Sequence, residues 1–158
     1  MLDDPDGQTP VRVRAGAIVV RDDRILLIQR SQRDERWFEI PGGGVEPDET
    51  PAGAVVRELC EETGLVGAVR SEVATVFKEQ GRQHYFLVDA VGDVADRASL
   101  DLDDDASPMW LPVADLVYAA VWPKRLAWRV ADWYTTGWPN APVQLSDSIV
   151  DLTQPCDR

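Results

Sequence analysis

The chain has 158 residues, enough for one domain, and 44% of them are hydrophobic, which is ordinary for a globular protein. Its 28 acidic and 16 basic residues give a formal net charge of −12, which disfavours binding to nucleic acid polymers and to anionic membranes. Cys60 and Cys156 are too few for a disulfide framework and lack zinc-ligand spacing. The sequence shows neither a signal pattern nor an apolar run of membrane-spanning length, so we expect a soluble cytoplasmic protein.

The first 40 residues are expected to form a disordered leader followed by strands. Residues 1–10 are rich in Asp, Pro and Gly, which is typical of a disordered leader. After them, β-branched and apolar runs bounded by charged residues predict a hairpin and a third strand. The expected elements are a strand at 11–20, a turn at 21–24, a short strand at 25–29, a charged loop at 31–36 and a strand at 37–40.

The central segment predicts a helix with well-defined ends. Thr50 suits the N-cap, Pro51 suits the first helical position, and Gly64 suits the C-terminal stop. Beyond it we expect alternating strands, a long acidic loop and two helices. These elements are strands at 68–78 and 83–91, a loop at 93–108, ordered chain again from Trp110, a short helix at 112–120 and a longer helix at about 123–135.

The pattern indicates one α/β domain over residues 11–136, with helices packed on a mixed sheet. Leu126, Val130 and Trp133 form the apolar stripe of the last helix. Residues 137–158 are polar, contain three prolines, and are predicted to form a loose C-terminal tail.

Three carboxylates of the central helix fall close together. At about 100° per residue, Glu58, Glu61 and Glu62 lie within roughly a 100° arc, and Ala52, Val56 and Leu59 lie on another side. Like charges at this spacing destabilise a helix slightly, and two of them lie near the C-terminus, where negative charge is unfavourable. Clustered carboxylate oxygens are suitable ligands for Mg²⁺ or Mn²⁺, so a metal site is one interpretation and a solvated acidic face is the other.

The residues that flank these carboxylates favour the metal site. The glycines of Pro41-Gly42-Gly43-Gly44 allow the backbone to approach a ligand closely. Residues 43 to 65 resemble the Nudix box, in which fixed glycine, glutamate, arginine and aliphatic positions recur at set spacing. The matching residues are Gly43, Glu49, Arg57, Glu58, Leu59, Glu61, Glu62, Gly64 and Leu65.

The resemblance implies an α/β/α sandwich in which the box forms a loop, a helix and a second loop. It implies that Glu58, Glu61 and Glu62 bind divalent metal, with the carbonyl of Gly43 as a further ligand and Glu58 as the first choice for general base. Arg57 and Glu49 would form a salt bridge that ties the loop to the helix. The implied reaction is attack of water on a phosphorus atom of a nucleoside diphosphate derivative or triphosphate.

Residues outside the box are candidates for substrate contacts and for one more metal ligand. Asp104 or Asp105 of the acidic loop is a candidate for an extra metal ligand or base. Asp104, our choice as the ligand, lies six residues before Trp110, where similar proteins often carry a glutamate. Arg14 and Arg30 are candidates for phosphate contacts, and Phe38 and Tyr85 for stacking on a base. His84, the only histidine, is a weaker candidate for a phosphate contact.

The substrate is the least defined part of the prediction. ADP-ribose hydrolases of this family carry a proline where this sequence has Gln80, and dinucleoside polyphosphate hydrolases carry a tyrosine where it has Arg82. A MutT-like pyrophosphohydrolase acting on nucleoside triphosphates is therefore the default. ADP-ribose or dinucleoside polyphosphate hydrolysis, and a nucleotide sensor without turnover, are the alternatives. The tryptophans of the C-terminal half are compatible with either a monomer or a homodimer.

Overall fold

The computed structural model describes residues 11–147, 149 and 151–153. The expected leader at 1–10 therefore lies outside the described residues. The chain forms two helices, α1 (Pro51–Thr63) and α2 (Lys124–Thr136), and two short 3₁₀ turns, η1 (Arg97–Ser99) and η2 (Val113–Val117). Neither helix is long and apolar enough to cross a membrane.

The strands form two mixed sheets. One sheet has the order β10-β6-β7-β1-β5, and the other has β2-β3-β4-β9 with β8 paired to β3. In chain order the strands are β1 (Arg12–Ile18), β2 (Val20–Arg21), β3 (Arg24–Gln32), β4 (Glu35–Glu39), β5 (Gly42–Gly44), β6 (Val66–Lys78), β7 (Gly81–Val91), β8 (Ala106–Pro112), β9 (Val121–Trp122) and β10 (Val143–Ser146).

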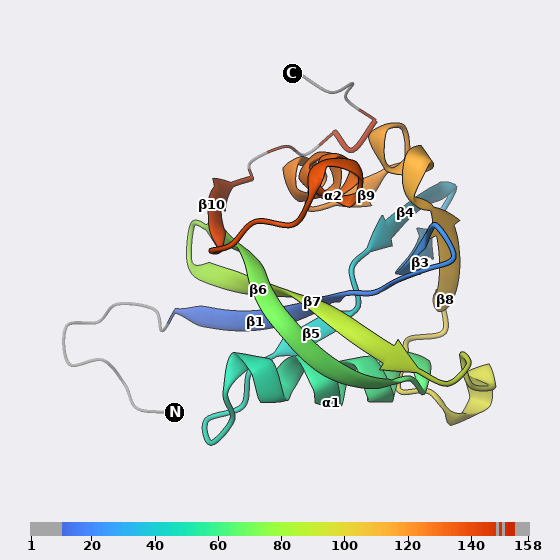
Figure 1. Cartoon of the computed structure of the whole chain (residues 1–158). Helices are drawn as coiled ribbons and strands as arrows, with labels where there is room; N and C mark the ends of the chain where they lie inside the picture. Colours follow the sequence, from blue (N-terminus) through green and yellow to red (C-terminus); the bar gives the residue numbers. More distant parts are fainter. Residues whose placement is uncertain (1–10, 148, 150, 154–158) are drawn as a thin grey trace.

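The helices lie on opposite sides of the strands, so the molecule is the expected α/β/α sandwich (Figure 1). Leu59 and Val55 of α1 pack with Ala17 and Phe86 of the first sheet in one core. Leu126, Val130 and Trp133 of α2 lie in a second core with residues from both sheets, which confirms their predicted stripe. Trp128 is also almost fully buried, so these tryptophans stabilise the domain itself.

The hairpin at the start of the domain differs from the prediction. The expected single strand at 11–20 is divided at Val19, because β1 pairs with β5 and β7 whereas β2 pairs with β3 in the other sheet. Asp22 and Asp23 both have positive φ angles, 52° and 61°, which is the conformation of a tight two-residue hairpin turn. The charged loop expected at 31–36 is mostly strand, with β3 and β4 joined around Arg33 and Asp34.

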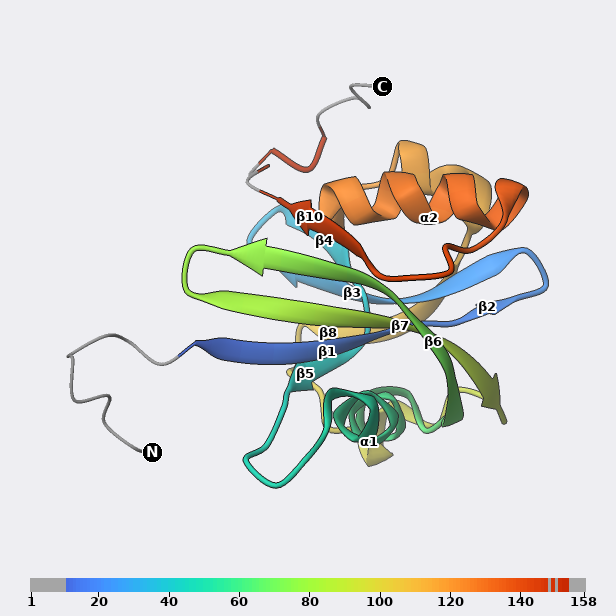
Figure 2. The same cartoon turned by 60° about the vertical axis from the view of Figure 1, so that its left-hand side comes forward.

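The last part of the chain is more ordered than its composition indicated. Val143–Ser146, within the predicted loose tail, form β10, which pairs in parallel with residues 74–77 of β6 (Figure 2). Leu145 is 8% exposed and belongs to the core beneath α2. Its burial, together with the packing of Val143 against the same core, explains why this mostly polar segment docks.

Docking of β10 can be tested with Leu145→Ala. Removing this side chain should lower the free energy of unfolding by about 2 kcal/mol, because a buried leucine loses both its burial and its packing contacts. Urea unfolding followed by circular dichroism measures the change. Gln144→Ala is the matched control, since Gln144 is exposed on the same strand and its loss should change stability by less than about 0.5 kcal/mol. Equal stabilities for both variants would mean that β10 is not held by its leucine.

Candidate active site

Arg57 connects the glycine-rich loop to helix α1. Its Nε and Nη2 atoms donate to the two carboxylate oxygens of Glu49 at 2.8 and 2.9 Å, and Nη2 also donates to the carbonyl of Gly44 at 3.0 Å. The expected salt bridge between Glu49 and Arg57 is therefore present. A paired contact of this kind fixes the orientation of the guanidinium plane as well as its position. It also lowers the pKa of Glu49 and raises that of Arg57.

The same guanidinium holds two of the clustered carboxylates. Nη1 of Arg57 lies 3.0 Å from Oε1 of Glu58 and 3.3 Å from Oε2 of Glu61. The Glu58 side chain is largely buried, at 17% exposed, whereas that of Glu61 is 40% exposed. Arg57 thus brings both carboxylates together beside the loop.

Glu62 is placed differently from the prediction. The helical spacing put its carboxylate on the face opposite the apolar stripe, but Glu62 is only 7% exposed and shares the buried face with Val55 and Leu59. The loop at 42–44 covers this face, and the backbone N–H of Gly42 donates to Oε1 of Glu62 at 2.8 Å. Burial raises the pKa of Glu62 to about 8, and the negative charge of Glu58 adds to that effect.

The glycines of the loop allow this close packing. A Cβ atom built at Gly43 would lie 2.3 Å from Cδ of Glu58, and one at Gly42 would lie 2.2 Å from the carbonyl oxygen of Ala15. Any side chain at either position would displace the carboxylate or the neighbouring strand. The loop backbone and the Glu58 carboxylate therefore share one small volume, as expected of a site where backbone and side chain serve the same ligand.

The oxygen donors of these carboxylates suit a hard divalent cation, although the side chains are not positioned to surround one. Within the described part of the chain, no three His, Cys, Asp or Glu side chains form a ready metal-binding group. Glu58 and Glu61 are turned towards Arg57, and Glu62 accepts from Gly42. The negative charge of Glu58 contributes to the raised pKa of Glu62, so the two carboxylates are close enough to interact. An all-oxygen set of this kind is suited to Mg²⁺ or Mn²⁺.

The acidic loop after β7 caps the end of α1. Backbone N–H groups of Ala95 and Asp101 donate to the carbonyls of Thr63 and Glu61, both at 2.9 Å. These bonds satisfy helix carbonyls that would otherwise lack partners, and they place the loop beside the box. Asp103, the neighbour of the predicted Asp104, lines the large cleft, and its Oδ2 lies 3.3 Å from Nη1 of Arg30. Asp104 is exposed and does not line either of the clefts described below.

A cleft of about 1120 Å³ opens beside the box and gathers five of the 16 basic residues. Arg14 and Arg30, predicted as phosphate contacts, both line it. The other three basic residues are Arg12, Lys78 and Arg82. Arg14 is aligned with Gly44 of the box loop, and the charges of Arg30 and Arg14 act to lower the pKa of Glu62. Arg14 and Arg30 therefore lie near enough to Glu62 to influence its charge, although no box carboxylate lines the cleft itself. The five cations make the cleft suited to an anion.

Two predicted substrate contacts instead belong to the core. Tyr85 is 3% exposed and donates its hydroxyl to Oε1 of Gln83 at 2.5 Å, so it is not available to stack on a ligand in this structure. Phe38 packs against the core beneath α2. His84 is 2.5 Å from Glu72 and is thus paired within the first sheet. Strand alternation could not have indicated this, because residues 85–88 are all buried and residues 37–39 are all half-buried.

No pattern in the sequence indicated that Lys78 and Trp122 belong to the site. Lys78 lies at the end of β6 and Trp122 in the two-residue strand β9, yet the Lys78 ammonium lies 4.1 Å from the centroid of the Trp122 ring. Both residues line the cleft. Their proximity depends on the packing of the two sheets, which no local pattern specifies.

Burial of Glu62 predicts an unusual pH dependence for the metal-free protein. Because its pKa rises from 4.5 to about 8 on folding, the folded state binds the proton more tightly than the unfolded chain does. The stabilising effect of the protonated form is complete below pH 4.5 and is lost as the pH rises to about 8. In EDTA, the free energy of unfolding of the wild type should therefore decline over this range relative to Glu62→Gln, as urea unfolding would show. Glu61→Gln, on the same helix, should retain the wild-type slope, and an identical slope in Glu62→Gln would contradict the prediction.

Comparison with known proteins identifies a family whose model spans the glycine-rich loop and helix α1. The NUDIX domain family model matches residues 10–135. Diphosphoinositol polyphosphate phosphohydrolase 3-beta from Bos taurus is 32% identical over 119 residues, covering 72% of this chain and 70% of the relative. The crystal structure of a MutT NUDIX hydrolase from Burkholderia pseudomallei is 27% identical with a TM-score of 0.61, covering 77% of this chain and 98% of that one.

A third similarity concerns the fold alone. The crystal structure of an ADP-ribose pyrophosphatase from Streptococcus suis is 20% identical, with a TM-score of 0.63 over 88% of this chain and all of that chain. The matched family region contains the glycine loop, Arg57, the carboxylate helix and most of the cleft. On this evidence the chain belongs to the NUDIX domain family and is a Nudix hydrolase.

Proposed function

We propose that this protein hydrolyses a phosphoanhydride bond in a nucleoside triphosphate or nucleoside diphosphate derivative, with the help of a divalent metal ion. The observation that carries the proposal is the position of the carboxylates Glu58, Glu61 and Glu62 next to a cleft lined by Arg14 and Arg30. A reaction at phosphorus needs anion-binding groups and a proton acceptor within reach of the same atom. This arrangement supplies both.

Glu58, Glu61, Glu62 and the carbonyl of Gly43 would hold Mg²⁺ or Mn²⁺. When bound, such a metal neutralises phosphate oxygens and acidifies water. Arg57 contributes by holding Glu58 and Glu61 from one side, so that their carboxylates remain together despite their repulsion. Asp104 remains a predicted additional ligand, and the position of Asp103 beside Arg30 makes it the stronger candidate from the acidic loop.

Substrate binding and proton transfer would then fall to arginines of the cleft and to a carboxylate of α1. Arg14 and Arg30 would bind phosphate oxygens and orient the anhydride towards the helix. Glu58 would take the proton of the attacking water, since its carboxylate is packed against the loop at Gly43 and is the more shielded of the two that Arg57 contacts. The products would be two phosphate esters, or one ester and inorganic pyrophosphate.

A second candidate substrate class is a diphosphoinositol polyphosphate. The supporting observations are the 32% identity to enzymes of that name and the five basic side chains of the cleft. A highly phosphorylated ring would contact more of these cations than a nucleotide does. The two candidates differ in whether the substrate has a flat aromatic base, and a direct assay separates them.

Turnover should depend on metal and on Glu61. Purified protein would be incubated with Mg²⁺ and separate nucleoside triphosphates, ADP-ribose, dinucleoside polyphosphates and a diphosphoinositol polyphosphate, with and without EDTA. Cleavage of one nucleotide class is expected, and EDTA should abolish it. Glu61→Gln should reduce kcat at least about 100-fold, because a carboxylate that serves the metal or the proton transfer is lost.

Asp48→Asn is the matched control for Glu61→Gln. Asp48 is an exposed acid in the loop before α1, and its substitution removes the same charge. This variant should retain kcat within about twofold, and both variants should keep the wild-type thermal midpoint. Cleavage of only the inositol compound would favour the second candidate. Nucleotide binding without turnover in the wild type would instead favour a sensor.

A further inference from the structure

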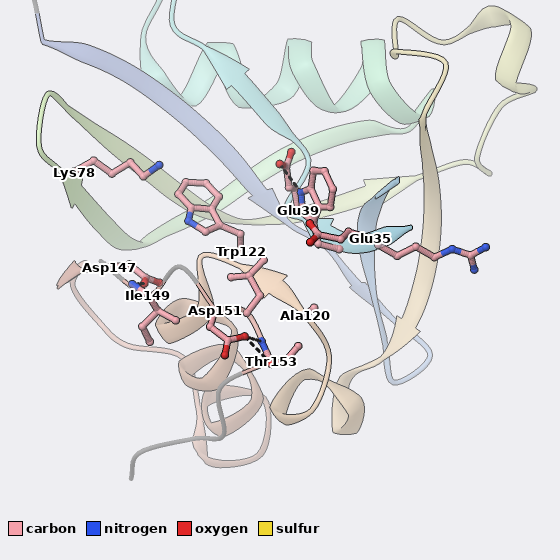
Figure 3. A pocket seen from close by; sticks show the side chains of 12 residues that line it. Glu35, Glu39, Lys78, Ala120, Trp122, Asp147, Ile149, Asp151 and Thr153 are labelled. Atoms are coloured by element: carbon pink, nitrogen blue, oxygen red, sulfur yellow. Dashed lines mark hydrogen bonds between the residues drawn. The ribbon is translucent and has the colours of Figure 1, made fainter. Parts of the chain in front are cut away.

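We propose that a second hollow is the subsite that binds the nucleobase of the substrate. It is formed by Trp122, Trp37 and five C-terminal residues, which are Asp147, Ile149, Asp151, Leu152 and Thr153. This inference rests on the proposed function, and it assigns specificity to residues outside the glycine-rich loop and helix α1, five of which also lie beyond the matched family region. The hollow has a volume of about 780 Å³, which is within the usual range of small-molecule sites (Figure 3).

The hollow is continuous with the phosphate-binding cleft. Lys78, Trp122, Glu39 and Asp147 line both. Lys78 lies at the junction, with its ammonium 4.1 Å from the centroid of the Trp122 ring. A nucleotide has the same two-part character, because a charged phosphate chain is joined through a sugar to a flat base. One ligand can therefore occupy both hollows, with its phosphates near Arg14 and Arg30 and its base near Trp122.

The charge of the second hollow distinguishes a base from a phosphate. Four acids but only two basic residues line it, and the acids are Glu35, Glu39, Asp147 and Asp151. This balance repels phosphate groups. It suits the N–H groups of a base, which carboxylate oxygens accept, whereas the two indoles and the side chains of Ile149 and Leu152 suit its flat apolar faces. A ring that carries phosphate groups all round would be repelled by these acids and has no flat apolar face to place against the indoles.

The wall supplied by the C-terminal segment is held in place by specific bonds. Oδ2 of Asp147 accepts from the backbone N–H of Arg125 at 3.0 Å, at the start of α2, and Oδ1 accepts from that of Ile149 at 3.1 Å. Asp147 follows directly after β10, which is itself paired with β6. Asp147 thus anchors the start of this wall to both the sheet and the helix, and the wall residues lie beyond the family match at 10–135.

The test is calorimetric titration of the full chain, in Mg²⁺, with the 5′-monophosphates of guanosine, adenosine, cytidine and uridine. Ribose 5-phosphate serves as the ligand without a base, and none of these compounds contains an anhydride that could be cleaved. The wild type should bind at least one nucleotide more tightly than ribose 5-phosphate. Trp122→Ala should weaken that binding roughly 5- to 150-fold, the range for a lost base–aromatic stack. It should weaken ribose 5-phosphate binding clearly less, although some loss is expected because the Trp122 ring also contacts Lys78.

Ala120→Trp provides a second variant that leaves every core side chain in place and fills the hollow instead, because Ala120 lines it. Ala120→Trp should also weaken nucleotide binding more than ribose 5-phosphate binding. If Trp122→Ala has a lowered thermal midpoint, Ala120→Trp alone decides whether the hollow binds the base. Tyr118→Ala is the matched control, since this aromatic residue is 85% exposed nearby and lines neither hollow. Wild-type nucleotide affinity in both test variants, or equal affinity of the wild type for nucleotides and ribose 5-phosphate, would overturn the proposal. If nucleotide binding depends on Trp122 but the separate assay shows no hydrolysis, only the proposed function is overturned. If nucleotides are hydrolysed and neither variant changes that hydrolysis, only the subsite is overturned.

Discussion

The contact on which the rest of this site depends is the pairing of Arg57 with Glu49 and the carbonyl of Gly44. One guanidinium spans the loop and the helix, and its remaining nitrogen holds Glu58 and Glu61. A lysine could not replace it, because a single ammonium cannot offer a planar pair of donors together with a third direction. The glycines then let the loop lie against these carboxylates, so backbone and side chains come into the same small space.

Charge is distributed unevenly between the cleft and the rest of the molecule. The chain as a whole is strongly acidic, yet basic side chains from β1, β3, β6 and β7 meet where the two sheets adjoin. Two of the cleft's acids, Glu39 and Asp103, are already paired with Arg30. Local attraction for an anion thus coexists with an overall repulsion of anionic polymers and surfaces. This combination suits a small phosphorylated molecule.

The extent to which the sequence predicted this structure depended on how local each feature is. Thr50, Pro51 and Gly64 define the ends of α1 through contacts within a few residues, and these ends were predicted correctly. The salt bridge of Arg57 followed from the family resemblance. Burial of Glu62 and Tyr85, the division of the first strand at Val19 and the docking of Leu145 depend on which distant strand covers each residue. The pairing of Lys78 with Trp122 had no sequence signal for the same reason.

The parallel pairing of β10 with β6 has a consequence for the order in which the protein is made. Strands β1 to β9, with the glycine loop and the carboxylate helix, emerge from the ribosome before Val143–Ser146. The chemical centre therefore has all its residues while one edge of the first sheet, at β6, is still uncovered. The segment that follows them covers that edge with β10 and, from Asp147, supplies a wall of the second hollow. A nascent chain halted before it would carry an assembled box beside an open strand edge, a form prone to pair with other chains.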